Sequence, residues 1–240
     1  MEMEKLDKIL SNMVVRIETE KERGTGFYIS EDLILTAYHV VEDCDIEEKI
    51  KEDLFSQEIK EEQFKIDIID TESGNSINKA FIFDKNEELD IALLKIRTKK
   101  ENIKILPFKL NKIKEYDKWR AYGCFEPLIG TNNSFEKKMM KGEIYQTECF
   151  KKNKYDLNLE SKYLKEEPCH GGYDGLSGSP IVINGKISGV IVQEEQSEID
   201  SPLKAVSTYK IKHFLQKNKI DLKTIGKEFL LDLSFTQEEI

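Results

Sequence analysis

The sequence predicts an all-β protein made of two six-stranded β-barrels and a closing C-terminal helix. Short runs rich in Val, Ile, Phe and Tyr recur along the 240 residues, and turn-forming or charged residues bound them. These runs form two groups of six, separated by a lysine-rich, weakly patterned segment at residues 97–118. All-β barrels often reach this length as one unit, and the pattern does not resemble the strand–helix alternation of a parallel sheet.

The first group of strands follows an N-terminal arm or short helix over residues 1–12. Residues 42–63 interrupt the group, and their many charges and helical propensity predict a surface helix inserted between strands. We assign residues 13–110 to the first barrel. Its strands are expected at residues 13–19, 24–30, 32–37, 64–70, 79–84 and 90–96.

The second group of strands occupies residues 111–219 together with a helix expected at 209–218. Asn184 and Gly185 form an "NG" pair between two strand-like runs, which is a hairpin turn signal. The tail at 220–240 is amphipathic, so it is a candidate for docking a partner or leading into a further domain. The strands are expected at residues 118–124, 141–150, 159–164, 179–184, 186–193 and 204–209.

Net charge and cysteine content limit the classes of partner and the cellular compartment that are expected. The net charge of −9 and pI of about 5.1 argue against nucleic acid or an anionic membrane as the main partner. The N-terminus has no apolar signal-peptide core, and no apolar run approaches the roughly 18 residues of a membrane-spanning helix. The four cysteines are far apart and are expected to be reduced thiols in a cytoplasmic protein: Cys44, Cys124, Cys149 and Cys169.

Three stretches contain residues with catalytic chemistry, in the order His, Asp, Ser. "LTAYHVV" places His39 in a turn just after an apolar strand, and "ELDIALLKI" places Asp90 just before another. "DGLSGSP" places Ser177 in a glycine-rich turn before the next strand. A serine hydroxyl needs a neighbouring base to take its proton, and that base needs a third group to orient it. We therefore predict Ser177 as nucleophile, His39 as general base and Asp90 as the orienting carboxylate.

The glycines beside Ser177 have a predicted role of their own. Acyl transfer builds negative charge on an oxygen in the transition state, and main-chain N–H groups aimed at that oxygen stabilise it. We expect the N–H groups of Gly175 and Ser177 to form this oxyanion hole, since Gly175 lacks a Cβ that would restrict its main chain. Gly178 is expected to allow close packing behind the nucleophile.

These motifs resemble those of the trypsin/chymotrypsin-like serine proteases over about residues 13–217. "GTGFYIS" and "LTAYHVV" are similar to the strand and histidine block of that family, "DIALLKI" to its aspartate block and "DGLSGSP" to its serine block. The resemblance implies a chymotrypsin-like fold of two six-stranded barrels, with His39 and Asp90 in the first and Ser177 in the second. It implies a serine endopeptidase that acts on protein or peptide substrates through an acyl-enzyme. No cofactor and no metal are implied.

The sequence departs from the secreted members of that family. Leu176 stands where they carry the aspartate that pairs with a newly cleaved N-terminus, so the chain looks closer to bacterial intracellular and HtrA-type members. For the substrate pocket the resemblance indicates Gly171 at the base and a wall of Val192, Gln193 and Glu194. Glu194 with Glu195 would favour a basic substrate side chain, and an open, unselective pocket is the alternative.

Two further interpretations stay open at this level. The chain is alternatively a catalytically idle pseudoprotease that serves as a protein-binding module. By analogy, compact trypsin-like domains resemble effectors held idle by a regulatory protein partner, for example in bacterial anti-phage defence.

Cys169 and His170 are adjacent in "PCHGG", and such a pair is also found in metal sites and beside cysteine nucleophiles. A loop role is preferred for both, because Ser177 occupies the nucleophile position.

Overall fold

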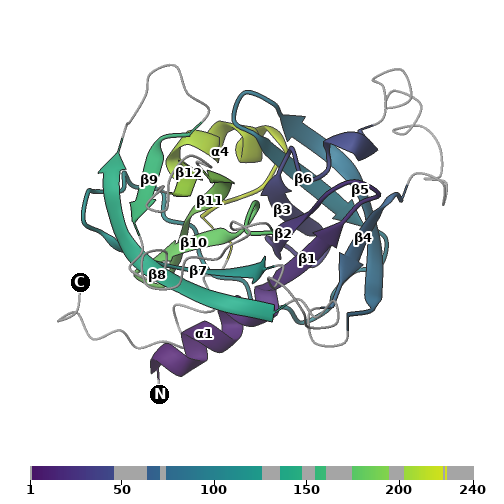
Figure 1. Ribbon diagram of the computed structural model, residues 1–240, viewed down its shortest axis with the longest axis horizontal. Helices are drawn as coiled ribbons and strands as arrows, with labels where there is room; N and C mark the ends of the chain where they lie inside the picture. The colour runs from purple at the N-terminus through teal and green to yellow at the C-terminus, as the bar shows by residue number, and fades with distance from the viewer. Residues whose placement is uncertain are drawn as a thin grey trace.

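Two closed six-stranded antiparallel β-barrels lie side by side, as the sequence predicts (Figure 1). The structure is a computed structural model. It describes residues 2–45, 64–70, 74–125, 136–147, 155–160, 175–194, 203–223 and 225.

The first barrel has the strand order β1-β2-β3-β6-β5-β4. Its interior is filled by large apolar side chains such as Ile17, Phe27 and Leu35, all of them fully buried. Of the surface helix predicted over residues 42–63, only a short 3₁₀ turn at Glu42–Cys44 is present in the described part, and residues 46–63 lie outside it. The strands are β1 (Val14–Glu18), β2 (Arg23–Tyr28), β3 (Leu33–Ala37), β4 (Ile66–Ile69), β5 (Ser76–Asn86) and β6 (Ile91–Ile96).

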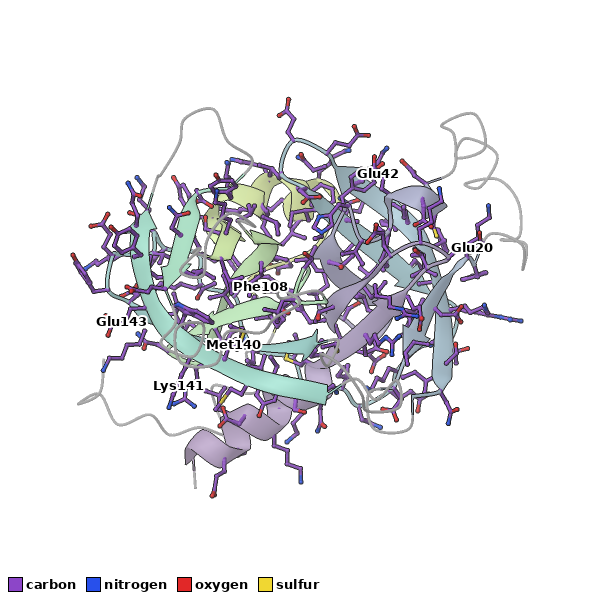
Figure 2. All side chains as sticks on the ribbon, viewed as in Figure 1. Glu20, Glu42, Phe108, Met140, Lys141 and Glu143 are labelled. Carbon is purple, nitrogen blue, oxygen red and sulfur yellow. The ribbon has the colours of Figure 1, made fainter. Side chains whose placement is uncertain are left out.

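The second barrel repeats the topology of the first in the order β7-β8-β9-β12-β11-β10. Strand β8 shows the alternation typical of a barrel wall: Met140 is fully buried, whereas Lys141 and Glu143 are exposed on the outer surface (Figure 2). Trp119 is 1% exposed and belongs to the core, as expected. The strands are β7 (Lys118–Phe125), β8 (Glu136–Thr147), β9 (Leu157–Glu160), β10 (Pro180–Ile183), β11 (Lys186–Glu194) and β12 (Leu203–Ser207).

Helices cover the barrels at both ends of the chain. The expected N-terminal arm is the helix α1 (Glu2–Met13), and an ion pair of 3.2 Å between Asp7 and Arg120 connects it to β7. The closing helix α4 (Thr208–Lys217) begins where the sequence predicted the last strand to continue, because the Ser207 hydroxyl caps it by accepting from the Lys210 N–H. No helix in the described ranges is long and apolar enough to cross a membrane.

The segment between the barrels contacts both of them. The Lys100 N–H donates at 2.7 Å to the carbonyl of Glu31, which lies between β2 and β3. Phe108 forms an isolated bridge with Ile187 of β11 and lies near the centre of Figure 2. The Leu106 N–H lies 3.3 Å from the Met13 sulfur at the end of α1. The predicted "NG" turn is confirmed between β10 and β11, with φ of +50° at Asn184 and +68° at Gly185. The connecting segment and the helices therefore join the barrels into one unit.

Candidate active site

The pairing of β3 with β6 places His39 beside Asp90. Ala37, the last residue of β3, pairs with Ile91, the first residue of β6. His39 thus follows β3 at the edge of the barrel where Asp90 precedes β6. The His39 Nδ1 lies 2.7 Å from Asp90 Oδ2, and the His39 main-chain N–H donates to Asp90 Oδ1 at 2.9 Å. The candidate base and the candidate orienting group are in direct contact.

The surroundings of the pair suit Asp90 to orient the ring. The Asp90 side chain is 12% exposed, whereas the His39 side chain is 40% exposed. A carboxylate oxygen only accepts hydrogen bonds, so Nδ1 carries a proton and Nε2 remains the basic nitrogen of the ring. Asp90 has a left-handed φ of +53°, which Asp tolerates better than most residues. The Tyr38 N–H also donates to the Asp90 carbonyl at 3.0 Å and holds the main chain of the pair.

The turn that carries Ser177 buries the residues on either side of it. Leu176 is 1% exposed and packs in the core of the second barrel, while Ser177 is only half-buried. The Ser179 N–H donates to the Leu176 carbonyl at 2.9 Å, and the Gly178 N–H donates to the Ile191 carbonyl of β11 at 2.7 Å. The turn is therefore anchored to the second barrel, with Ser177 as its half-buried residue between two buried ones.

The two amides predicted to bind an oxyanion are available. Gly175 has a φ of +94°, a conformation that favours glycine. Within the part of the chain that the structure describes, the N–H groups of Gly175 and Ser177 donate to no acceptor, in contrast to those of Gly178 and Ser179. Both residues are only half-buried, so these two N–H groups can donate to a bound carbonyl oxygen.

The turn also contacts the first barrel, next to the segment that carries His39. The Ser177 carbonyl accepts from the Thr25 N–H of β2 at 2.8 Å. A Cβ on Gly24 would lie 3.0 Å from the Ser177 carbonyl oxygen and 2.6 Å from both Val40 methyl groups, so Ser177 and the residue after His39 flank Gly24. Among the described residues, no hydrogen bond joins the Ser177 hydroxyl to the His39 ring, and such bonds are often long without substrate.

Gly178 is packed as closely as expected. A Cβ there would lie 1.8 Å from the Thr25 carbonyl oxygen and 2.4 Å from the Thr36 hydroxyl, and its φ is +91°. No side chain fits in that space without moving main chain, so the close packing expected at Gly178, next to Ser177, is confirmed.

Thr25 is a part of this site that the sequence analysis did not identify. It is fully buried, and its hydroxyl donates to the Gly175 carbonyl at 2.5 Å. A signal was present in "GTGFYIS", where a single polar residue stands between two glycines at the start of an apolar strand. A polar side chain in such a setting is buried and must find a hydrogen-bond partner.

The residues predicted for the substrate pocket are only partly described. Val192 lies on β11 and is 2% exposed, so its side chain packs in the core. Gln193 and Glu194 end the same strand, and Gly171 lies outside the described residues. The composition of the pocket stays a prediction.

The described cysteines are not candidates for nucleophiles. Burial raises the pKa of Cys124 to about 11, and burial together with the neighbouring Asp43 raises the pKa of Cys44 to about 12. Both are free thiols, as expected, and a protonated thiol is a poor nucleophile. Cys149, Cys169 and His170 lie outside the described residues, and the described ranges hold no group of three or more His, Cys, Asp or Glu that could bind a metal ion.

Comparison with protein families gives a match that covers most of the chain. The model of the trypsin-like peptidase domain matches residues 24–190, a range that includes His39, Asp90 and Ser177. Comparison with curated proteins gives no match.

Solved structures share the fold at low sequence identity. An active form of the Rv3671c protease from M. tuberculosis has a TM-score of 0.61 and 16% identity, with 90% of this chain and 85% of that chain covered. An inactive form of the same protease has a TM-score of 0.57, 16% identity and coverage of 88% and 91%. A serine endoprotease from Yersinia pestis has a TM-score of 0.60 and 18% identity, with 89% of this chain and 65% of that chain covered.

Proposed function

Since this chain belongs to the trypsin-like peptidase family of serine proteases, we propose that it is an endopeptidase whose triad is His39, Asp90 and Ser177. The observation that carries this proposal is the double contact of Asp90 with His39, at 2.7 and 2.9 Å, beside a turn that presents Ser177. Its substrate class is a peptide or protein segment.

The proposed reaction begins with attack of Ser177 Oγ on the carbonyl carbon of the scissile peptide bond. His39 Nε2 takes the hydroxyl proton as the C–O bond forms, and Asp90 stabilises the resulting imidazolium. The carbonyl oxygen becomes negative and accepts from the N–H groups of Gly175 and Ser177. Donors of this kind are each worth about 2.7–4 kcal/mol of barrier.

The C–N bond then breaks, and the leaving amine takes the proton from His39 Nε2. An ester between Ser177 and the acyl half of the substrate remains. Water attacks this ester as His39 removes its proton, and the reverse proton transfer to Ser177 Oγ releases the carboxylic acid product. His39 thus acts first as a base and then as an acid in each half of the reaction.

The nucleophile turn supports activity without the activation step of secreted relatives. Leu176 is buried in the second barrel and offers no carboxylate that an inserted N-terminus would pair with. The turn is held instead by main-chain hydrogen bonds to Ile191 and Thr25. We therefore propose that the purified chain is competent without proteolytic processing.

Labelling by a fluorophosphonate probe tests the proposed function. The wild type is expected to be labelled on Ser177, and Ser177→Ala and His39→Ala are expected to lose the label. Ser179→Ala is the matched control: Ser179 is two residues away and fully buried, and in the described chain its hydroxyl has no hydrogen-bond partner. Removing that hydroxyl is expected to be nearly neutral. No labelling of a folded wild type would contradict the proposal and favour the idle, protein-binding alternative.

A further inference from the structure

The hydroxyl of Thr25 connects the first barrel to the oxyanion turn of the second. We propose that Thr25 is a positioning residue of this protease, which holds the main chain of Gly175 in the orientation that the transition state requires. The inference rests on the proposed function, because it assigns Thr25 a role in the same site. Thr25 itself does not touch the reacting atoms.

Every polar group of Thr25 has a partner in or behind the turn. Its N–H donates to the Ser177 carbonyl at 2.8 Å, and its hydroxyl donates to the Gly175 carbonyl at 2.5 Å. The same hydroxyl oxygen accepts from the Cys124 N–H of β7 at 2.9 Å. The Thr25 carbonyl accepts from the Thr36 hydroxyl at 2.7 Å.

The Cys124 contact determines where the hydroxyl proton points. A threonine hydroxyl has one proton to donate, and its oxygen accepts through lone pairs. Because the Cys124 N–H occupies a lone pair, the proton is directed to the Gly175 carbonyl. Thr25 is fully buried, so water does not compete for these bonds. The hydroxyl therefore joins β7 and the turn at one point.

These bonds constrain the peptide groups on either side of an oxyanion donor. The Gly175 carbonyl belongs to the peptide that links Gly175 to Leu176, and the Ser177 carbonyl to the peptide that links Ser177 to Gly178. Thr25 is hydrogen-bonded to both of these planar peptide groups. The Ser177 N–H belongs to the peptide group between them, which links Leu176 to Ser177. Gly175 has no side chain to hold it at its φ of +94°. The hydrogen bond from Thr25 supplies that restraint.

A matched set of variants separates this role from a structural one. Thr25→Val removes the hydroxyl and keeps the shape, and Thr25→Ser keeps the hydroxyl. Thr208→Val is the control for stability, since Thr208 is also fully buried and its hydroxyl also donates to a carbonyl, that of Lys109, at 2.5 Å. It lies at the start of α4, and within the described residues its hydroxyl contacts only the carbonyls of Lys109 and Ser188, which are not part of the turn.

The first measurement is the rate of fluorophosphonate labelling of Ser177, with thermal unfolding in parallel. Thr25→Val is expected to slow labelling by about 10- to 100-fold, less than the roughly 10²- to 10³-fold cost of deleting an oxyanion donor. Thr25→Ser should stay within about threefold of wild type, as expected if the hydroxyl carries the effect. Thr208→Val should lower the unfolding temperature as Thr25→Val does, yet label at the wild-type rate. Equal rates for Thr25→Val and Thr208→Val would overturn the proposal.

The second measurement does not depend on activity. The chain has 13 glycines, and Asp174–Gly175 is its only Asp–Gly pair. Labelling Asp with ¹³C at the carbonyl and Gly with ¹⁵N therefore isolates the Gly175 amide as a single NMR signal. The signal is expected to shift or broaden in Thr25→Val and to stay in place in Thr25→Ser and Thr208→Val.

The two measurements distinguish failure of this inference from failure of the proposed function. An unmoved Gly175 signal in Thr25→Val would overturn the inference whether or not the wild type is labelled. A moved signal with an unchanged labelling rate would overturn the role in the reaction. A wild type that is not labelled would contradict the proposed function, and the NMR signal would still decide whether Thr25 holds Gly175.

Discussion

Asp90 accepts two hydrogen bonds from a single residue, His39, and they come from different parts of it. One carboxylate oxygen lies 2.7 Å from the ring Nδ1 and the other accepts from the main-chain N–H at 2.9 Å. The ring cannot turn without breaking the first bond, and the loop cannot move without breaking the second. The position and the tautomer of His39 therefore depend on the same buried carboxylate.

Asp90→Asn is expected to keep the fold and remove most of the activity. Asn has one acceptor oxygen, and the His39 main-chain N–H needs it, so the Asn NH₂ faces Nδ1. The ring proton then moves to Nε2, where a base is needed, and labelling or peptide hydrolysis should fall by about 10⁴-fold. Glu88→Gln changes an exposed carboxylate two residues away and should leave both rates unchanged. A fall of less than tenfold in Asp90→Asn would show that Asp90 does not set the tautomer.

Gly178→Ala is expected to disrupt the turn that carries Ser177. Its Cβ would lie 1.8 Å from the Thr25 carbonyl oxygen, so main chain in one of the barrels must move. Gly74→Ala is the matched control, because Gly74 also has a positive φ, +68°, but no described residue beyond its chain neighbours lies within 4 Å of the added Cβ. The control should show only backbone strain, about 1–2 kcal/mol. Thermal unfolding measures both, and equal loss of stability in the two variants would contradict the packing argument.

Asp84 is expected to contribute stability that depends on pH, because it connects α4 to the first barrel. Its Oδ2 accepts from Asn218 Nδ2 at 2.8 Å and from Lys217 Nζ at 3.2 Å. Burial by itself would raise the pKa of Asp84, but hydrogen bonds from Asn218, the Lys85 amide and Lys217 outweigh it, and the pKa lies below its usual value. The ionised carboxylate is thus favoured by folding.

The sign of that dependence follows from the lowered pKa. The contribution is complete above about pH 4, the range of an unfolded aspartate, and is lost as the pH falls through the lower pKa of the folded state. Asp84→Asn should lower the unfolding temperature by about 2–4 °C at pH 7, corresponding to about 1 kcal/mol. The difference from wild type should shrink below pH 4. Unfolding curves at pH 7, 5, 4 and 3 measure it, and a difference that stays constant with pH would refute the assignment.

The strands of both barrels could be predicted because their signal is local. Runs of β-branched and aromatic residues between turn signals mark most of the twelve strands, and their division into two sixes matches the two barrels. Strand β9 has no such residue, and the run expected at 159–164 overlaps it only at its end. The strand boundaries expected from the sequence agree less well with the structure. Strand β8 begins at Glu136 because Glu136 pairs with Phe125, and β9 lies at Leu157–Glu160 because it pairs with Leu203–Ala205 of β12. A partner strand decides such limits, and the partner is distant in the sequence.

The candidate site also has a part that could be predicted from the sequence and a part that could not. His39, Asp90 and Ser177 could be singled out because each stands at a fixed offset from a strand in a motif with its own chemistry. The pairing of Ala37 with Ile91 then brings His39 next to Asp90. No local sequence pattern predicts this pairing. The substrate pocket depends on loops whose shape the sequence does not specify, and it stays a prediction.

The sequence by itself determined which segments form strands and which residues are candidates for the chemistry, since both depend on side-chain type and short-range spacing. Only the tertiary structure decided that Thr25 meets Gly175, 150 residues further along the chain. That hydrogen bond exists because the two barrels pack with β2 against the turn that carries Ser177, close enough that only glycine fits at position 178. Contacts of this kind depend on the distance between two folded units, and a single sequence does not contain that distance.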